Sequence, residues 1–158
     1  MNWQEVIENP ALHDLPFKIE TDETGKIIMS AVEVRHSLYQ GEIGFLMRTM
    51  RQNGFVMTEC AVKTNKGTKV ADVAWASIER VLQICDSVEA LIAPEVCVEV
   101  LSASNTTDEM SKKRELYFEN SAVEFWICNE SGAMQFFNAQ GELEQSTLFP
   151  DFPAQIKI

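Results

Sequence analysis

The sequence predicts an α/β fold in which a mixed central sheet is flanked by helices. Three observations carry this prediction. Residues 95–101 form a nearly continuous apolar run broken by one glutamate, which is typical of a central strand covered on both faces. Residues 35–52 carry apolar side chains at approximately helical spacing over several turns. Residues 95–129 follow the order strand, helix, strand, which predicts a right-handed parallel crossover.

The sequence of the first half of the chain predicts a short helix, a hairpin, a long helix and a second pair of strands. Residues 17–21 alternate apolar and polar side chains, as a half-buried strand does. Asn53-Gly54 follows the long helix and is expected to end it. In chain order the expected elements are residues 2–8, 17–21 with 26–30, 35–52, and 55–63 with 69–76.

The second half predicts two capped helices between apolar strands. Ser77 can cap a short helix that runs through Ile84. Thr106 and Glu109 form a capping box that starts a helix running to about residue 120. The remaining expected elements are the strand at 95–101, a buried strand at 123–129, a strand at 133–138 and an irregular packed tail at 148–153.

Length and composition indicate a globular protein. The chain has 158 residues, and we expect a single domain over residues 1–158. At 46% hydrophobic residues it can bury a core. No run reaches the roughly 18 apolar residues of a membrane span, so we expect no membrane association. Residues 1–5 lack the pattern of a secretory signal, and a cytoplasmic location is therefore expected.

Charge and cysteine content restrict the function further. The formal net charge is −11, from 24 acidic and 13 basic residues. Such a protein repels phosphate at long range, so contact with nucleic acid needs a local basic patch or metal ions. The four cysteines form no CxxC pair, and we interpret them as small core residues in a reducing compartment. They are Cys60, Cys85, Cys97 and Cys128.

Two isolated carboxylates are the first candidates for chemistry. Asp72 lies in the middle of an apolar strand, and Glu99 lies likewise in the next one. Burying an unpaired carboxylate anion costs several kcal/mol, and two on neighbouring strands would repel unless a cation or shared proton lay between them. Mg²⁺ accepts carboxylate oxygens and keeps several waters. We expect a metal site here. The alternative is that each acid forms a salt bridge with lysine or arginine at the end of the sheet.

A lysine follows on the next helix. Lys113 lies at spacings of three and four from Met110 and Tyr117, hence on the same face, which we expect to pack on the sheet. A lysine there can supply a cation near an attacking water and share a proton. The alternative is a lysine that extends to solvent and pairs with Glu109. Lys112 points elsewhere and is expected to be solvated.

Weaker candidates surround these three residues. Glu20, beside Lys18 on the first strand, could be a further acidic ligand or base, or an ordinary exposed glutamate. His36, at the start of the long helix, is more typical of a surface or capping residue. Glu42 and Glu59 are minor candidates for site acids. The sequence has no GxSxG, P-loop or GxGxxG motif, and no aromatic-and-basic pattern typical of single-strand binders.

Four motifs in this order resemble the Uma-two family of putative restriction endonucleases: residues 70–75, 93–102, 113–118 and 123–127. The resemblance covers nearly the whole chain, and residues 15–20, 35–36 and 148–150 also fit it. The family is placed in the PD-(D/E)XK nuclease superfamily. The resemblance therefore implies a restriction-endonuclease-like core and Mg²⁺-dependent hydrolysis of phosphodiester bonds.

The resemblance also assigns residues. Asp72 matches the superfamily aspartate and Glu99 its second acid. Ala71 stands where the signature proline usually stands, which is not a ligand. Leu101 occupies the position of the signature lysine, two residues after the acid. Members of the family resemble one another in placing a lysine on the next helix instead. The matching residue in this sequence is Lys113.

The expected function is that of a metal-dependent DNA endonuclease. Asp72, Glu99 and the carbonyl of Val100 would hold Mg²⁺, or Mn²⁺ in its place, and Lys113 would orient or deprotonate the bound water. Glu20 would complete the shell. A homodimer is expected because two sites must meet two strands. The alternative is a catalytically degenerate nuclease fold that acts as a binding or assembly module.

Overall fold

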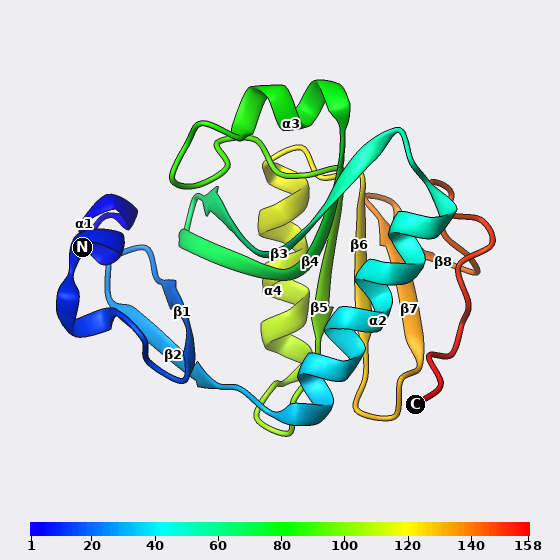
Figure 1. The fold of residues 1–158 in the computed structure, drawn as a ribbon, viewed down its shortest axis with the longest axis horizontal. Helices are drawn as coiled ribbons and strands as arrows, with labels where there is room; N and C mark the ends of the chain where they lie inside the picture. Colours follow the sequence, from blue (N-terminus) through cyan, green and yellow to red (C-terminus); the bar gives the residue numbers. More distant parts are fainter.

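The computed structural model describes residues 1–158 and contains two sheets (Figure 1). A six-stranded sheet has the order β3 (Gly54–Thr64), β4 (Gly67–Ser77), β5 (Val96–Val100), β6 (Glu124–Cys128), β7 (Met134–Asn138) and β8 (Gly141–Leu143). A separate two-stranded sheet contains β1 (Phe17–Thr21) and β2 (Ile27–Ala31). Within the large sheet β5 and β6 are parallel and every other neighbouring pair is antiparallel. The fold is therefore mixed α/β, as the sequence predicts.

The helices and strands follow the expected order closely. The helices are α1 (Trp3–Glu8), the 3₁₀ helix η1 (Pro10–Leu12), α2 (Val34–Met50), α3 (Ile78–Ile84) and α4 (Thr107–Glu119). The strands are β1 (Phe17–Thr21), β2 (Ile27–Ala31), β3 (Gly54–Thr64), β4 (Gly67–Ser77), β5 (Val96–Val100), β6 (Glu124–Cys128), β7 (Met134–Asn138) and β8 (Gly141–Leu143).

Helices cover both faces of the large sheet. On one face α2 packs against alternate residues of the central strands, including Val96, Val98 and Val100 of β5. On the other face α3 and α4 pack against the residues between them, such as Cys97. Because β5 is buried on both sides, its single carboxylate, Glu99, lies in the core on the α4 side.

The β1–β2 hairpin is held against the β3–β4 turn by polar contacts rather than by strand pairing. Thr68 N donates to Thr21 Oγ1 at 2.8 Å, and Lys69 Nζ donates to Thr21 O at 2.7 Å. Gly67 has φ +85° in this turn, and a Cβ there would lie 2.4 Å from two hairpin carbonyl oxygens. Only glycine tolerates both the left-handed backbone and this approach. The hairpin thereby brings β1 to the end of the large sheet (Figure 1).

The structure corrects the expected end of the long helix. The helix ends at Met50, and its cap, Arg51, is extended rather than left-handed. Gly54 is the first residue of β3, so it does not terminate the helix. A Cβ at Gly54 would lie 2.4 Å from both the carbonyl oxygen of Ala76 and the ring of Trp75. This glycine is required by close strand packing, which a short-range capping pattern does not distinguish.

Two smaller expectations are also corrected. Only half of the capping box forms: Thr106 accepts from Glu109 N, while the Glu109 carboxylate accepts from Asn105 Nδ2. The cysteines are all free, as expected, but Cys85 is exposed and is not a core residue. Its position at the end of α3 turns it toward solvent. No helix combines the length and apolarity needed to cross a membrane.

The C-terminal tail packs on the sheet through a buried carboxylate. Glu124 at the start of β6 accepts hydrogen bonds from Trp126 Nε1 (2.7 Å) and Ser146 Oγ (2.6 Å). It also accepts from the backbone amides of Thr147 and Leu148, at 2.8 and 3.0 Å. Four donors saturate this carboxylate, so its role is structural and the tail is the packed cover that the sequence predicts.

Candidate functional site

Five buried charged side chains converge where the hairpin, the central strands and α4 meet. Three are acids, Glu20 on β1, Asp72 on β4 and Glu99 on β5. Two are lysines, Lys18 on β1 and Lys113 on α4, and each side chain of the five is at most 11% exposed. Buried charges of this number persist only when they compensate one another.

Asp72 and Glu99 lie on neighbouring strands and share a cation, which is a lysine. The antiparallel register pairs Val73 with Val98, and one further step brings Asp72 beside Glu99. Lys18 Nζ lies 2.9 Å from Asp72 Oδ1 and 3.1 Å from Glu99 Oε2. A cation therefore lies between the two acids, and here it is the ammonium that the β1 hairpin supplies, which matches the salt-bridge alternative.

The second oxygen of Asp72 is also held. Val100 N donates to Asp72 Oδ2 at 2.7 Å, and His36 Nε2 of α2 lies 3.2 Å from the same oxygen. Val100 was expected to contribute its carbonyl to the site, whereas its amide is the group that contacts Asp72. Both oxygens of Asp72 are thus oriented, one by Lys18 and one by the start of α2 and the end of β5.

Lys113 contacts the other side of the acid pair. Its Nζ lies 2.9 Å from Glu20 Oε1 and 3.4 Å from Glu99 Oε1. Tyr117, one turn further along α4, donates to Glu99 Oε1 at 3.0 Å. Met110, Lys113 and Tyr117 are all buried, so the helical phase expected from the sequence is the observed one. The alternative pairing of Lys113 with Glu109 does not form.

Glu20 is a buried member of the cluster rather than an exposed strand glutamate. It is 5% exposed. Its Oε1 accepts from Val70 N at 2.7 Å as well as from Lys113. Glu20 therefore links the hairpin both to β4 and to α4, and it fixes the position of the Lys113 ammonium.

The surroundings in the cluster shift the pKa values of Glu99 and Asp72 in opposite directions. Burial raises the pKa of Glu99, and although Lys113 and Lys18 oppose this, the pKa of Glu99 reaches about 7. Burial also acts to raise the pKa of Asp72, but the hydrogen bond from His36 and the charge of Lys18 outweigh it and hold that pKa below its usual range. Glu99 is thus the acid that exchanges a proton near neutrality.

The lysines stay charged. Burial acts to lower the pKa of Lys18, but Glu99, Asp72 and Glu20 together raise it above its ordinary value. Burial likewise acts to lower the pKa of Lys113, and Glu99 and Glu20 outweigh this effect. Both ammonium groups therefore remain donors at neutral pH, and neither is a free base while the acids surround it.

Sequence reasoning gave no site role to Lys18 and left the role of His36 open. Lys18 lies two residues before Glu20 on a five-residue strand and so shares its face, which was the available signal. His36 lies in the first turn of α2, and no sequence pattern places it beside Asp72. Its Nδ1 is buried without a hydrogen-bond partner, and the hydrogen bond to Asp72 raises the pKa of His36.

The two minor acids differ in their surroundings. Glu42 is exposed on α2 and makes no contact with the cluster. Glu59 is exposed on β3 and accepts from Gln40 Nε2 at 3.0 Å. Glu59 has φ +54°, and the β3–β4 pairing is interrupted at this residue, beside Asp72. A left-handed non-glycine residue next to a buried charged cluster is typical of functional sites.

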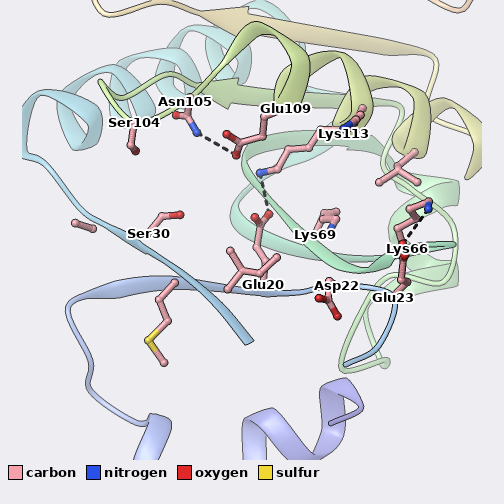
Figure 2. A pocket seen from close by; sticks show the side chains of 15 residues that line it. Glu20, Asp22, Glu23, Ser30, Lys66, Lys69, Ser104, Asn105, Glu109 and Lys113 are labelled. Atoms are coloured by element: carbon pink, nitrogen blue, oxygen red, sulfur yellow. Dashed lines mark hydrogen bonds and ion pairs between the residues drawn. The ribbon is translucent and has the colours of Figure 1, made fainter. Parts of the chain in front are cut away.

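Two cavities open onto the cluster. A narrow one, of about 40 Å³, lies over Lys18, His36, Asp72 and Glu99. A larger one, of about 650 Å³, lies between the hairpin, the β3–β4 turn and α4, and Glu20 and Lys113 line it (Figure 2). The charged cluster is therefore buried but can be approached from outside.

The residues fit a hard cation held by two carboxylates. Asp72 Oδ1 and Glu99 Oε2 already converge on one positive charge, and Mg²⁺ commonly binds proteins through one or two carboxylates with water completing its shell. No set of three His, Cys, Asp or Glu side chains is arranged to hold a metal ion. A bound ion would therefore depend on Asp72 and Glu99, and Lys18 would have to give up its place between them.

Comparison with known proteins identifies the family. Residues 10–155 match the family model described as "Uma2: Putative restriction endonuclease". The chain belongs to the Uma2 family. No curated protein matches this Uma2 chain significantly. Its fold is similar to the crystal structure of a protein from Anabaena variabilis described as a putative nuclease belonging to DUF820. The TM-score is 0.72 at 19% identity, over 90% of this chain and 82% of the other.

The Uma2 assignment and the structural match agree on the class of fold. The core is restriction-endonuclease-like, with a mixed six-stranded sheet between helices. The family description supports a nuclease, and the structural match supports the fold. In this Uma2 chain, the acids and the lysine assigned from the sequence lie in a single cluster.

Proposed function

We propose that this Uma2 protein is a Mg²⁺-dependent endonuclease that hydrolyses phosphodiester bonds of DNA, with Mn²⁺ able to replace Mg²⁺. The observation that carries the proposal is the convergence of Asp72 and Glu99 on one cation position, with Lys113 on the far oxygen of Glu99. Two carboxylates that can hold a metal ion and a separate lysine that can stabilise negative charge suit metal-assisted hydrolysis of a phosphate ester.

Asp72 and Glu99 would hold the metal ion, with the carbonyl of Val100 as a further ligand. The ion would lower the pKa of a bound water and stabilise the charge that develops on the phosphate. Neighbouring residues orient the two carboxylates toward this position. Val100 N and His36 fix one oxygen of Asp72, and Tyr117 fixes Oε1 of Glu99, so the two remaining oxygens point to a common place.

Lys113 would orient the attacking water and stabilise negative charge on it. Its ammonium is held by Glu20 at 2.9 Å and reaches Glu99 Oε1 at 3.4 Å. Glu20 is thus a positioning residue for Lys113 in this proposal. The pKa of Glu99, about 7, belongs to the metal-free protein, and a bound ion would hold Glu99 as a carboxylate.

The experiment is cleavage of duplex DNA by the purified protein in Mg²⁺ or Mn²⁺. We expect cleavage by the parent and its loss in Asp72→Asn, by at least about a hundredfold, as for removal of a group that stabilises transition-state charge. Asp108→Asn is the matched control, because Asp108 is an exposed acid paired with Lys112. Loss of activity in Asp108→Asn as well, or full activity in Asp72→Asn, contradicts the proposal.

A second candidate is a catalytically degenerate nuclease fold that binds a partner. Lys18 favours it, because this ammonium neutralises Asp72 and Glu99 without any metal ion. Calorimetry separates the two candidates. Heat of Mg²⁺ binding that disappears in Asp72→Ala supports the nuclease, whereas absence of binding together with absence of cleavage supports the degenerate fold.

We further propose that the protein acts as a single domain, in the cytoplasm and as a homodimer. Free cysteines suit a reducing compartment. A dimer would bring two sites to the two strands of a duplex. Exposed apolar side chains on one face of α2, at Val34, Leu38 and Phe45, support such a contact. Sedimentation velocity with and without DNA measures the assembly.

A further inference from the structure

The larger cavity contains a buried lysine to which the proposed hydrolysis assigns no role. Lys69 of β4 is 8% exposed and lines this cavity together with Glu20 and Lys113. Its Nζ donates to the carbonyl oxygen of Thr21 at 2.7 Å, and this is its only hydrogen bond. The ammonium is therefore buried against a neutral acceptor. Figure 2 shows Lys69 among the residues that line the cavity.

Lys69 differs from the other lysines of the cavity. Each of the other three forms an ion pair with a carboxylate at 2.9 Å: Lys66 with Glu23, Lys112 with Asp108 and Lys113 with Glu20. Lys69 has no carboxylate within ion-pair distance. It is the one cation of this cavity without a counter-ion.

The acids that line the cavity are engaged elsewhere. Glu20 and Glu23 are held by lysines, Glu109 accepts from Asn105, and Asp22 accepts from the amides of its own turn. Each of them already has a partner, and none lies within 4.0 Å of Lys69 Nζ. Burial accordingly lowers the pKa of Lys69, which is the behaviour of an ammonium that lacks an anion.

A buried ammonium without a counter-ion is stabilised by any anion that enters beside it. The cavity of about 650 Å³ is within the usual range of ligand sites. The half-exposed side chains of Ile28 and Met29 also line it and can contact a sugar or base. The narrow cavity over the acid pair adjoins this one, because Asn105, Glu109 and Lys113 line both.

We propose that this cavity receives the nucleotide next to the scissile phosphate, with its phosphate bound by Lys69. The assignment rests on the proposed nuclease function and adds a substrate-binding residue to it. Lys69 makes no contact with Asp72 or Glu99, so its role is to hold the strand rather than to take part in the chemistry.

The test is binding of a labelled DNA oligonucleotide in the presence of a chelator, where no metal-dependent cleavage occurs. Lys69→Gln removes the charge but keeps a donor for the Thr21 carbonyl. We expect about tenfold weaker binding, the loss of one charge-assisted contact. The slope of log affinity against log salt should also become shallower by about 0.7 to 0.9, the value for one phosphate contact.

Lys66→Gln is the matched control. Lys66 lines the same cavity, and its substitution removes the same charge. Its side chain, however, is 63% exposed and already paired with Glu23. We expect little change in affinity. Equal binding by the parent and Lys69→Gln, equal loss in both variants, or absence of binding by the parent overturns the proposal. If Lys69→Gln does not fold, Lys69→Arg must retain binding, and its failure also overturns the proposal.

Two further measurements separate the alternatives. Inorganic phosphate and a 5′-mononucleotide are titrated as competitors, and a mononucleotide that binds as tightly as the oligonucleotide would make this a free-nucleotide site instead of a strand subsite. Cleavage is assayed in parallel. Selective loss of binding in Lys69→Gln with no cleavage by the parent keeps the subsite and refutes hydrolysis, whereas cleavage with unchanged binding refutes the subsite alone.

Discussion

Glu99 determines how the charged cluster balances. The cluster contains three carboxylates and two ammonium groups, so it carries one unmatched negative charge unless a further proton is bound. Two groups can hold that proton near neutrality. Burial raises the pKa of Glu99 to about 7, and the hydrogen bond to Asp72 raises the pKa of His36. The metal-free site is thus linked to pH through these two side chains.

This linkage predicts that the metal-free protein loses stability as the pH rises toward 8. Glu99 has a folded-state pKa above its ordinary value of 4.5, so the folded protein binds more protons than the unfolded chain between about pH 4.5 and 7. The stabilisation is fully present below pH 4.5 and is lost as pH rises through 7. The pKa of Glu99 shifts from 4.5 to about 7, and at about 1.4 kcal/mol per pKa unit this shift corresponds to about 3 kcal/mol of folding free energy. The raised pKa of His36 acts in the same direction.

Urea denaturation at a series of pH values, with a chelator present, measures this effect. Glu99→Gln cannot lose a proton, so its free energy of unfolding should vary less between pH 5.5 and 8 than that of the parent. The remaining slope belongs to His36 and should be reduced in His36→Gln. A parent whose stability increases over this interval, or a slope unchanged in Glu99→Gln, contradicts the assigned pKa of Glu99.

Single residues differed in how far the sequence could place them. Asp72, Glu99 and Lys113 were found because each interrupts an apolar pattern, which is a local signal. Lys18 reaches Asp72 across 54 positions of sequence. That contact depends on how the hairpin packs against β4, which periodicity does not report. The same reason explains why a metal ion, and not Lys18, was expected between the two acids.

At the scale of elements, the periodic segments were predicted well and their docking was not. The parallel β5–α4–β6 unit follows from its apolar strands and capped helix, and β5 and β6 are parallel as expected. The separate β1–β2 sheet was not expected. Its position depends on Gly67 and on the contacts of Thr21 with Thr68 and Lys69, which join segments far apart in sequence.

The phase of α4 yields a prediction that compares two adjacent lysines. Lys113 points to the acid pair, whereas Lys112, about 100° further round the helix, is 72% exposed and paired with Asp108. If Lys113 orients the attacking water, Lys113→Met should abolish Mg²⁺-dependent cleavage. Lys112→Met should retain activity within a few-fold, because a solvated ion pair contributes little.

Circular dichroism and melting temperature accompany this comparison, since Lys113→Met leaves Glu20 and Glu99 with fewer partners. Lys113→Arg separates folding from function. It keeps a positive charge against Glu20, but its planar guanidinium does not reproduce the point charge of an ammonium. Full activity in Lys113→Met, or equal loss in both methionine variants, would refute the role of Lys113.

At the scale of the whole molecule, the net charge of −11 opposes the proposed substrate. Long-range repulsion slows the encounter with DNA, and salt screens it over about 8–10 Å. Local contacts behave in the opposite way, because salt competes with each phosphate bound by a lysine. The two effects act on different rate constants, so they can be measured separately.

We therefore expect the association rate constant for DNA to rise with salt, while the dissociation rate constant rises more steeply. Lys69 is the cation of the larger cavity without a counter-ion, and its one phosphate contact gives a slope of log affinity against log salt of about −0.9 per protomer on duplex DNA. Stopped-flow fluorescence between about 50 and 200 mM salt, with a chelator present, measures both rate constants.

A basic DNA-binding surface with six to ten contacts would instead give a slope of about −5 to −9 and an association rate that falls with salt. That outcome would mean that a surface other than this cavity holds the strand, because only four lysines line the cavity.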